Sequence, residues 1–74
     1  MEPTGDNIRR LREAQGMSGY KLAKLADITP GYLRDIETGR NRNPGVAVVR
    51  KVAKALGVDP GVLLREPEEA EGGQ

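Results

Sequence analysis

The sequence predicts an all-α domain built from five short helices. Apolar residues recur at steps of three and four along most of the chain, the spacing that gathers them on one face of a helix. Residues that start helices (Ser, Thr-Pro, Asp-Pro) and residues that end them (Gly) divide this pattern into short segments, and no strand pattern is found. The 74 residues include two tyrosines but no phenylalanine or tryptophan, so the core must come from Leu, Ile, Val and Ala, which suits packed helices.

The first predicted helix covers residues 6–15. Ile8 and Leu11 lie three apart and face inward, and Gly16 follows as a C-terminal stop. Residues 1–5 precede the apolar pattern, so we expect a flexible N-terminus there.

The second predicted helix covers residues 19–26, with the sequence GYKLAKLA. Ser18 precedes it and offers its hydroxyl to the free amides of the first turn. Three apolar residues share the inward face: Leu22, Ala23 and Ala26. Asp27 and Ile28 form the following turn, where Asp tolerates the left-handed conformation that such turns often need.

The third predicted helix covers residues 29–38 and hides only two aliphatic residues, Leu33 and Ile36. Thr29 is a good N-cap, and Pro30 at the first helical position loses no hydrogen bond because that amide would be unpaired anyway. Gly39 stands where a left-handed residue would end the helix.

Two further helices complete the predicted domain, which we assign to residues 6–65. The fourth follows the basic loop RNRNP, ends at Gly57 and carries Val46, Val49, Val52, Ala53 and Leu56 at three- and four-residue steps. The fifth is short, starts at Asp59-Pro60 and carries Val62, Leu63 and Leu64.

Charge is distributed unevenly along the chain, although the formal net charge is only +1. Residues 66–74, EPEEAEGGQ, contain four of the 11 acidic residues and no base. We expect them to form a disordered acidic tail, because they are too poor in apolar residues to fold. Residues 1–65 therefore hold 12 bases and seven acids, a net charge of +5.

The composition excludes several classes of function. The chain has no cysteine and no histidine, which removes disulfides, the usual zinc sites and the common catalytic nucleophile pairs. We therefore expect no enzyme, no metal and no cofactor, and no small-molecule ligand is evident. The apolar runs are far shorter than the roughly 20 residues of a membrane helix, and the start MEPTGDN lacks the pattern of a signal peptide, so we expect a cytoplasmic protein without a membrane partner.

The 19–26 and 29–38 helices are separated by a turn of the length found in helix-turn-helix units. In such a unit the second helix lays its outward N-terminal positions against DNA. With Leu33 and Ile36 turned inward, those positions are Pro30, Gly31, Arg34 and Asp35.

Residues 8–64 resemble the phage-repressor and Cro type of helix-turn-helix domain, the XRE family. The matching features, in order, are LRE before a glycine, a helix that starts at Ser18 and carries LA, the LxxIExG pattern of residues 33–39, an Asn-Pro after a basic loop, and AKALGV before a short closing helix. The resemblance implies a compact five-helix lambda-repressor-like domain that binds operator DNA, commonly as a homodimer. Two positions depart from the family pattern: Asp27 replaces the usual turn Gly, and Gly19 replaces a Gln that reaches a phosphate in many relatives.

We expect four residues to contact bases. Arg34 can bond both acceptors of guanine in the major groove, and its alternative is a contact with a phosphate or with Asp35. Asp35 can accept from a cytosine amino group or steer an arginine. Pro30 and Gly31 bring no donors, so they can offer only apolar contact, for instance to a thymine methyl, or close backbone approach.

Residues expected at the DNA backbone lie at the starts of both helices and in the loop after the second. They are Ser18, Gly19, Tyr20, Lys21, Thr29, Tyr32, Thr38, Arg40, Asn41 and Arg42. Ser18 and Thr29 are caps first, although a helix N-terminus with free amides also suits a phosphate. The alternative role of Tyr32 is to cover the 19–26 helix. The alternative for the loop arginines is that they belong to a solvated basic loop.

The resemblance also implies two structural features. Arg12 and Glu37 match an ion pair that joins the first and third helices in the family. Relatives often dimerise through the closing helix, which makes Val58, Val62 and Leu63 the candidates for a two-fold patch.

The sequence thus favours a sequence-specific regulator of transcription that binds double-stranded DNA, with the 29–38 helix in the major groove. A repressor that acts as a homodimer on a near-palindromic operator is the first interpretation, and a phage repressor, a restriction-modification controller and an antitoxin all remain open. The alternative class is a protein-interaction module that retains the fold, such as an antitoxin-type protein whose partner is a toxin or an anti-repressor.

Overall fold

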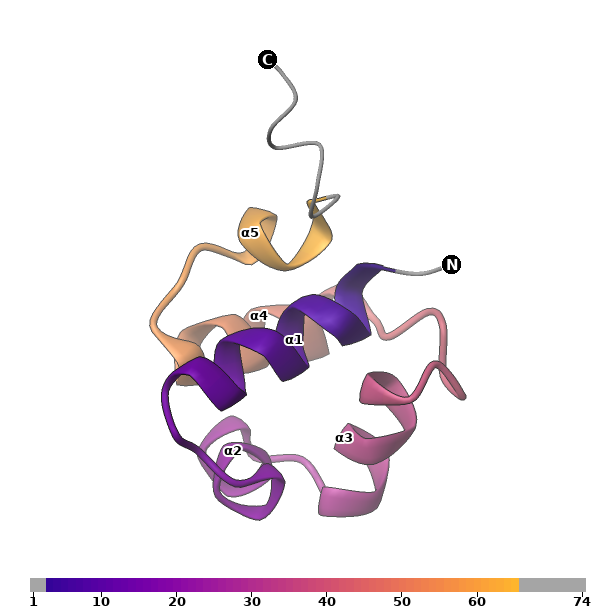
Figure 1. The fold of residues 1–74 in the computed structure, drawn as a ribbon. Coiled ribbons are helices and arrows are strands. Elements are labelled where there is room, and N and C mark those ends of the chain that lie inside the picture. The colour runs from indigo at the N-terminus through magenta and orange to yellow at the C-terminus, as the bar shows by residue number, and fades with distance from the viewer. Residues whose placement is uncertain (1–2, 66–74) are drawn as a thin grey trace.

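The computed structural model describes residues 3–65, which form five α-helices joined by short connections (Figure 1). In chain order the helices are α1 (Pro3–Ala14), α2 (Gly19–Ala26), α3 (Pro30–Glu37), α4 (Val46–Leu56) and α5 (Pro60–Leu64). No strand occurs within this range, so the predicted all-α class is confirmed. The acidic tail predicted at residues 66–74 lies outside the described residues.

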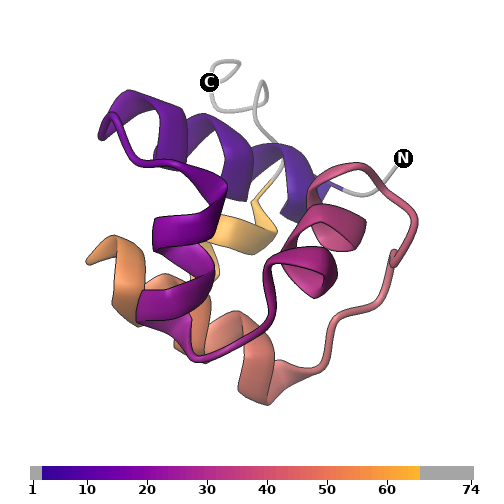
Figure 2. The ribbon, with the colours of Figure 1, turned by 90° about the horizontal axis from the view of Figure 1, so that it is seen from below.

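The helices pack around α1 and α4, which lie in the middle of the molecule in Figure 1. α5 lies on one side of this pair, against both helices, and α2 and α3 lie on the other side, α2 against α4 and α3 against α1. Seen from below, α2 and α3 are neighbours joined by one short connection (Figure 2). No helix among residues 3–65 is both long enough and apolar enough to cross a membrane.

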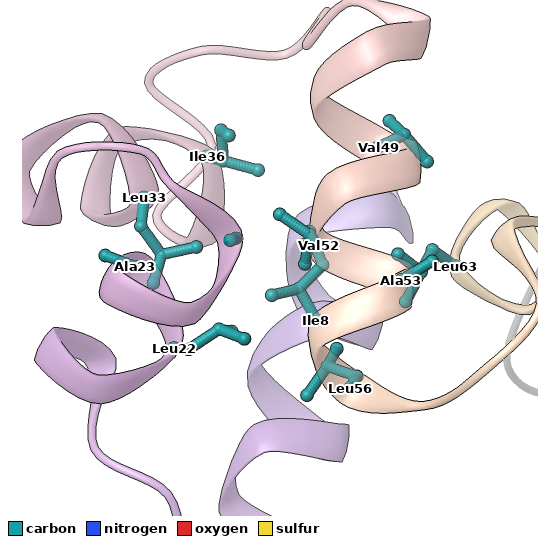
Figure 3. Close-up of a cluster of buried hydrophobic side chains, with 11 residues drawn as sticks. Ile8, Leu22, Ala23, Leu33, Ile36, Val49, Val52, Ala53, Leu56 and Leu63 are labelled. Carbon is teal, nitrogen blue, oxygen red and sulfur yellow. The ribbon is translucent and has the colours of Figure 1, made fainter.

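A single aliphatic core joins all five helices (Figure 3). Its buried members are Ile8, Leu22, Ala23, Ala26, Leu33, Ile36, Val49, Val52, Ala53, Leu56 and Leu63. α2, α3 and α4 contribute residues spaced by three or four positions, as expected for short helices that each bury one face, whereas α1 and α5 contribute one buried aliphatic residue each, Ile8 and Leu63.

Side-chain caps fix where α2, α3 and α5 begin. The Ser18 hydroxyl accepts a hydrogen bond from the Lys21 amide at 3.0 Å, and the Thr29 hydroxyl accepts one from the Tyr32 amide at 3.1 Å. At the start of α5, an Asp59 carboxylate oxygen accepts from the Gly61 amide at 3.2 Å. These bonds satisfy amides that have no partner inside the helix.

The start of α1 differs from the sequence prediction. The helix begins at Pro3 rather than at residue 6, so residues 3–5 are helical and do not form a flexible N-terminus. The reason is tertiary packing: Thr4 and Gly5 are buried, and Gly5 lies against the main chain of Ile36 at the end of α3. A proline at the first position of a helix is also a start signal, as it is in α3 and α5.

Two apolar residues of the predicted fourth and fifth helices face solvent. Val46, at the start of α4, is exposed, and Leu64 of α5 is 56% exposed. Leu63, in contrast, is completely buried within the domain. The prediction that Leu63 belongs to an exposed two-fold patch is therefore wrong, because its side chain is used to hold α5 against the core.

Asn7 also anchors α5, a role that the sequence did not reveal. Its side-chain amide donates to the carbonyl oxygens of Leu63 and Arg65, both at 2.8 Å, and its carbonyl oxygen accepts from Arg10. The carbonyls at the end of a helix lack partners within it, so a buried asparagine on α1 acts as a cap for α5.

Paired substitutions in α5 test this packing. Leu63→Ala is expected to lower the free energy of unfolding by about 2 kcal/mol, at the lower end for a buried leucine, because a terminal helix can shift to fill part of the cavity. Leu64→Ala, at the adjacent exposed position, is expected to change it by less than about 0.5 kcal/mol. Urea unfolding followed by circular dichroism measures both; equal losses would contradict the observed burial.

Candidate nucleic-acid interface

The start of α2 presents polar groups and one lysine to solvent. Ser18 and Lys21 are exposed, and Tyr20 is 67% exposed although it is aromatic. Gly19 has open space around it, since a β-carbon added there would meet nothing within 4 Å. The first amides of α2 therefore face an accessible surface at the positive end of the helix dipole.

The turn between α2 and α3 depends on a left-handed residue. Asp27 has φ 61° and ψ 45°, and the amide of Ile28 donates to the Ala23 carbonyl oxygen at 3.0 Å. This closes α2 and reverses the chain within three residues, after which Thr29 caps α3. The aspartate that departs from the family's usual glycine thus adopts the conformation that the turn requires.

α3 has one buried face and one open face. Leu33 and Ile36 are buried, whereas Pro30, Gly31 and Arg34 are exposed. Asp35, which was grouped with these residues in the sequence analysis, is half-buried. Within residues 3–65 Arg34 takes part in no ion pair, with Asp35 or any other acid, so its guanidinium is available to an external partner.

Tyr32 lies at the border between these two faces. It is half-buried and packs against the hydrophobic core, which corresponds to the covering role that the sequence left as an alternative. Its other expected role, contact with a phosphate, is not tested by this packing.

The loop after α3 is partly held by its own hydrogen bonds. The Asn41 amide donates to the Asp35 carbonyl oxygen at 2.9 Å, and the Asn41 side-chain oxygen accepts from the Asn43 amide at 3.0 Å. Arg40 and Arg42 are exposed and form no ion pair within the described part of the chain. The loop therefore carries two free guanidinium groups on a short, internally bonded frame.

Two threonines of the expected interface lie at the two ends of α3. Thr38 is exposed, and its hydroxyl donates to the Arg34 carbonyl oxygen at 2.8 Å. Gly39 follows with φ 85°, a conformation that glycine adopts without strain, and ends the helical turn. Thr29, also exposed, uses its hydroxyl as the α3 cap.

Arg12 holds α3 in place through Glu37. The Arg12 Nε and Nη2 atoms donate to the two Glu37 carboxylate oxygens at 2.8 Å and 2.9 Å, and Nη1 donates to the Met17 carbonyl oxygen at 2.9 Å. The side chains are only 15% and 9% exposed. The hydrogen bonds that Arg12 donates to Glu37 raise the pKa of Arg12 above its usual value, although burial opposes this. The guanidinium thus ties α1, the α1–α2 loop and the end of α3 together.

A hollow of about 420 Å³ separates this ion pair from the outward face of α3. It is bordered by Arg12, Gly19, Tyr20, Pro30, Leu33, Arg34 and Glu37. The glycine at position 19 leaves the hollow open on the α2 side. Among residues 3–65 no three His, Cys, Asp or Glu side chains lie close enough together to hold a metal ion.

The expected site residues thus lie on one connected surface made of the start of α2, the outward face of α3 and the loop that follows. Sequence reasoning missed the residues that support this surface from behind, of which Gly5 contacts the end of α3. A signal was present, because a glycine within a helix costs stability relative to alanine and often marks a close approach between backbones.

Comparison with known proteins identifies the family of the chain. A family model described as helix-turn-helix matches residues 8–63. The chain belongs to the XRE family of helix-turn-helix regulators.

Among relatives, it is 41% identical over 61 residues to the control protein C.BamHI of Bacillus amyloliquefaciens, covering 81% of this chain and 74% of that protein. The chain spans a much smaller part of some other curated relatives. It is 34% identical to an HTH-type transcriptional regulator of Methanocaldococcus jannaschii, and the match covers 74% of this chain but only 23% of that protein.

Solved structures of regulators have the same fold. The restriction-modification controller protein C.AhdI from Aeromonas hydrophila superposes with a TM-score of 0.78 at 34% identity, covering 82% of this chain and 91% of that one. The biofilm regulator SinR, solved in complex with DNA, gives a TM-score of 0.81 at 32% identity, covering 84% and 98%. The predicted lambda-repressor-like helix-turn-helix fold is therefore confirmed.

Proposed function

We propose that this chain is a sequence-specific transcriptional regulator that binds double-stranded DNA with α3 in the major groove. The observation that carries the proposal is Arg34, an exposed guanidinium without an ion-pair partner among the described residues, on the outward face of a helix that Arg12 and Glu37 hold rigidly. An arginine on a helix held in this way can bond the two acceptors of a guanine, a contact worth about 1–3 kcal/mol of discrimination between bases. The likeness to SinR, a structure that includes DNA, supports this assignment.

The remaining interface residues fit the DNA backbone on either side of that contact. Lys21 and the free amides at the start of α2 suit one phosphate, and Arg40 and Arg42 suit the strand that passes the end of α3. Ser18 and Thr29 contribute mainly as caps that orient these amides. Asn41 is expected to contribute through its side-chain Nδ2, because its main-chain amide and its side-chain oxygen already bond within the loop.

We further propose that the regulator acts as a homodimer, and as a repressor, on a near-palindromic operator. The half-buried Val58 and Val62, with exposed Leu64 in place of the buried Leu63, form an apolar surface on and beside α5 that suits a two-fold contact. Such a dimer would set its two α3 helices about 34 Å apart, which is one turn of DNA.

Selection of bound duplexes from a random library tests the proposal, with wild type, Arg34→Ala and Arg9→Ala in parallel. Arg9 is an exposed arginine of α1 that is not among the expected interface residues, and it serves as the control. Wild type and Arg9→Ala are expected to enrich the same inverted repeat. Arg34→Ala is expected to lose the preference at one position of each half-site, with about tenfold weaker binding.

Two outcomes would count against the assignment. Enrichment of a single half-site would contradict the homodimer but leave DNA recognition intact. No enrichment by a folded wild-type protein would contradict DNA recognition itself and favour the alternative class, a protein-interaction module that retains the fold.

A further inference from the structure

The N-terminal end of α3 presents a surface that has almost no hydrogen-bonding groups. Pro30 has no polar side-chain atom and no amide hydrogen, and Gly31 has no side chain, yet both are exposed. The ring of Tyr20 is exposed beside Pro30, since the two residues together border a hollow of about 350 Å³ on one side and one of about 420 Å³ on the other. Half-buried Ile28 lines the first hollow.

The fold does not require a glycine at position 31. A β-carbon added there would meet nothing within 4 Å, and the residue lies in the first turn of α3 with an ordinary helical conformation. The absence of a side chain thus leaves the backbone of α3 free to approach a ligand closely, which is one of the established uses of glycine.

Positive charges on both sides of this apolar surface are complementary to the negative phosphates of a DNA duplex. Arg34 borders the larger hollow and Lys24 the smaller one, so cations flank Tyr20 and Pro30 where phosphates would pass. The acids that line the two hollows are Asp27, which faces Lys51 at 4.0 Å, and Glu37, which is engaged by Arg12. The apolar surface therefore faces outward between positive groups.

In the major groove the only apolar group that distinguishes one base from another is the methyl at C5 of thymine. We propose that Pro30 and Gly31, with the ring of Tyr20, form a reader of C5-methyl groups, which packs one such methyl of the operator against the Pro30 ring and the Gly31 backbone. This inference rests on the proposed function and specifies what the start of α3 reads, while Arg34 reads a different base through hydrogen bonds. Because no polar side chain at positions 30 and 31 inspects the neighbouring edge atoms, 5-methylcytosine should be accepted in place of thymine.

The first test uses the wild-type protein and the operator found by selection. Each thymine is replaced in turn by uracil, which removes the methyl group and keeps every hydrogen-bonding atom. At one thymine of each half-site the replacement is expected to weaken binding about fourfold, the effect of losing one buried methyl group. At the same position cytosine is expected to weaken binding and 5-methylcytosine to restore most of it.

Three protein variants assign the effect to its residues. Pro30→Ala is expected to reduce the ratio of thymine to uracil affinity, because alanine keeps only part of the apolar contact that the proline ring makes. Arg34→Ala is expected to weaken binding to both DNAs while leaving that ratio unchanged. Pro60→Ala, the equivalent change in the same cap-Pro-Gly start of α5, is the matched control and should alter neither α3 nor the ratio.

The outcomes separate this inference from the proposed function. If wild type binds a defined operator but no uracil replacement weakens it, or if a folded Pro30→Ala variant keeps the full thymine preference, methyl reading by this surface is wrong and DNA recognition stands. If no operator is selected, the proposed function fails and the methyl reader fails with it. The uracil series needs no protein variant, so the absence of any uracil effect overturns the inference even if Pro30→Ala is poorly folded.

Discussion

Replacing Glu37 by leucine is expected to lower the free energy of unfolding by about 3 kcal/mol, which corresponds to a fall in melting temperature of about 12–24 °C for a domain of this size. The substitution removes both acceptors of the Arg12 guanidinium, whose side chain is only 15% exposed. A nearly buried cation then keeps a single described partner, the Met17 carbonyl oxygen. The loss should lie at the lower end of the range for broken buried pairs, because some water still reaches Arg12. Thermal and urea unfolding followed by circular dichroism measure it.

Two further variants separate the loss of the ion pair from other effects of the substitution. Glu13→Leu makes the same change at an exposed acid of α1 that forms no ion pair among residues 3–65 and acts on Arg12 less than Glu37 does. It is expected to alter stability by less than about 0.5 kcal/mol. The double variant Arg12→Met/Glu37→Leu should recover most of the lost stability, because it removes the uncompensated charge along with its partner. If Glu37→Leu costs no more than Glu13→Leu, the pair does not hold α3.

The features predicted well from the sequence are those that depend on neighbouring residues. Ser18, Thr29 and Asp59 cap helices as expected, and Asp27 adopts the left-handed conformation of the turn. Such features depend on hydrogen bonds that span two or three residues, so a local pattern contains the information needed. The inward faces of α2 and α3 follow from spacing for the same reason.

The features that could not be predicted depend on contacts between distant parts of the chain. Asn7 bonds to carbonyl groups more than 50 positions away, at the end of α5. The opposite environments of Leu63 and Leu64 likewise depend on how α5 meets α1 and α4, because a five-residue helix has too few positions to define a face by spacing. For the candidate site, outward positions could be assigned from the helical pattern, whereas the internal bond of the Asn41 side chain required the folded loop.

Gly5→Ala is expected to destabilise the domain by about 3 kcal/mol, although alanine is the better helix former. Gly5 lies within α1 where that helix crosses the end of α3, and an added β-carbon would overlap the carbonyl oxygen of Ile36 and lie 3.1 Å from its carbonyl carbon. Overpacking costs typically about 1–3 kcal/mol, and the upper end applies because a main-chain carbonyl cannot rotate away as a side chain can. Relief requires α1 and α3 to move apart, which would also strain the nearby Arg12–Glu37 pair.

The sign of the effect distinguishes this contact from ordinary helix propensity. Gly31→Ala makes the same substitution in the first turn of α3, where an added β-carbon meets nothing within 4 Å, and is expected to leave stability unchanged or raise it by up to about 1 kcal/mol. Propensity alone would predict a gain at both positions, so a loss at Gly5 together with no loss at Gly31 can come only from the crossing of α1 and α3. A gain at both would mean that the two helices are free to separate there.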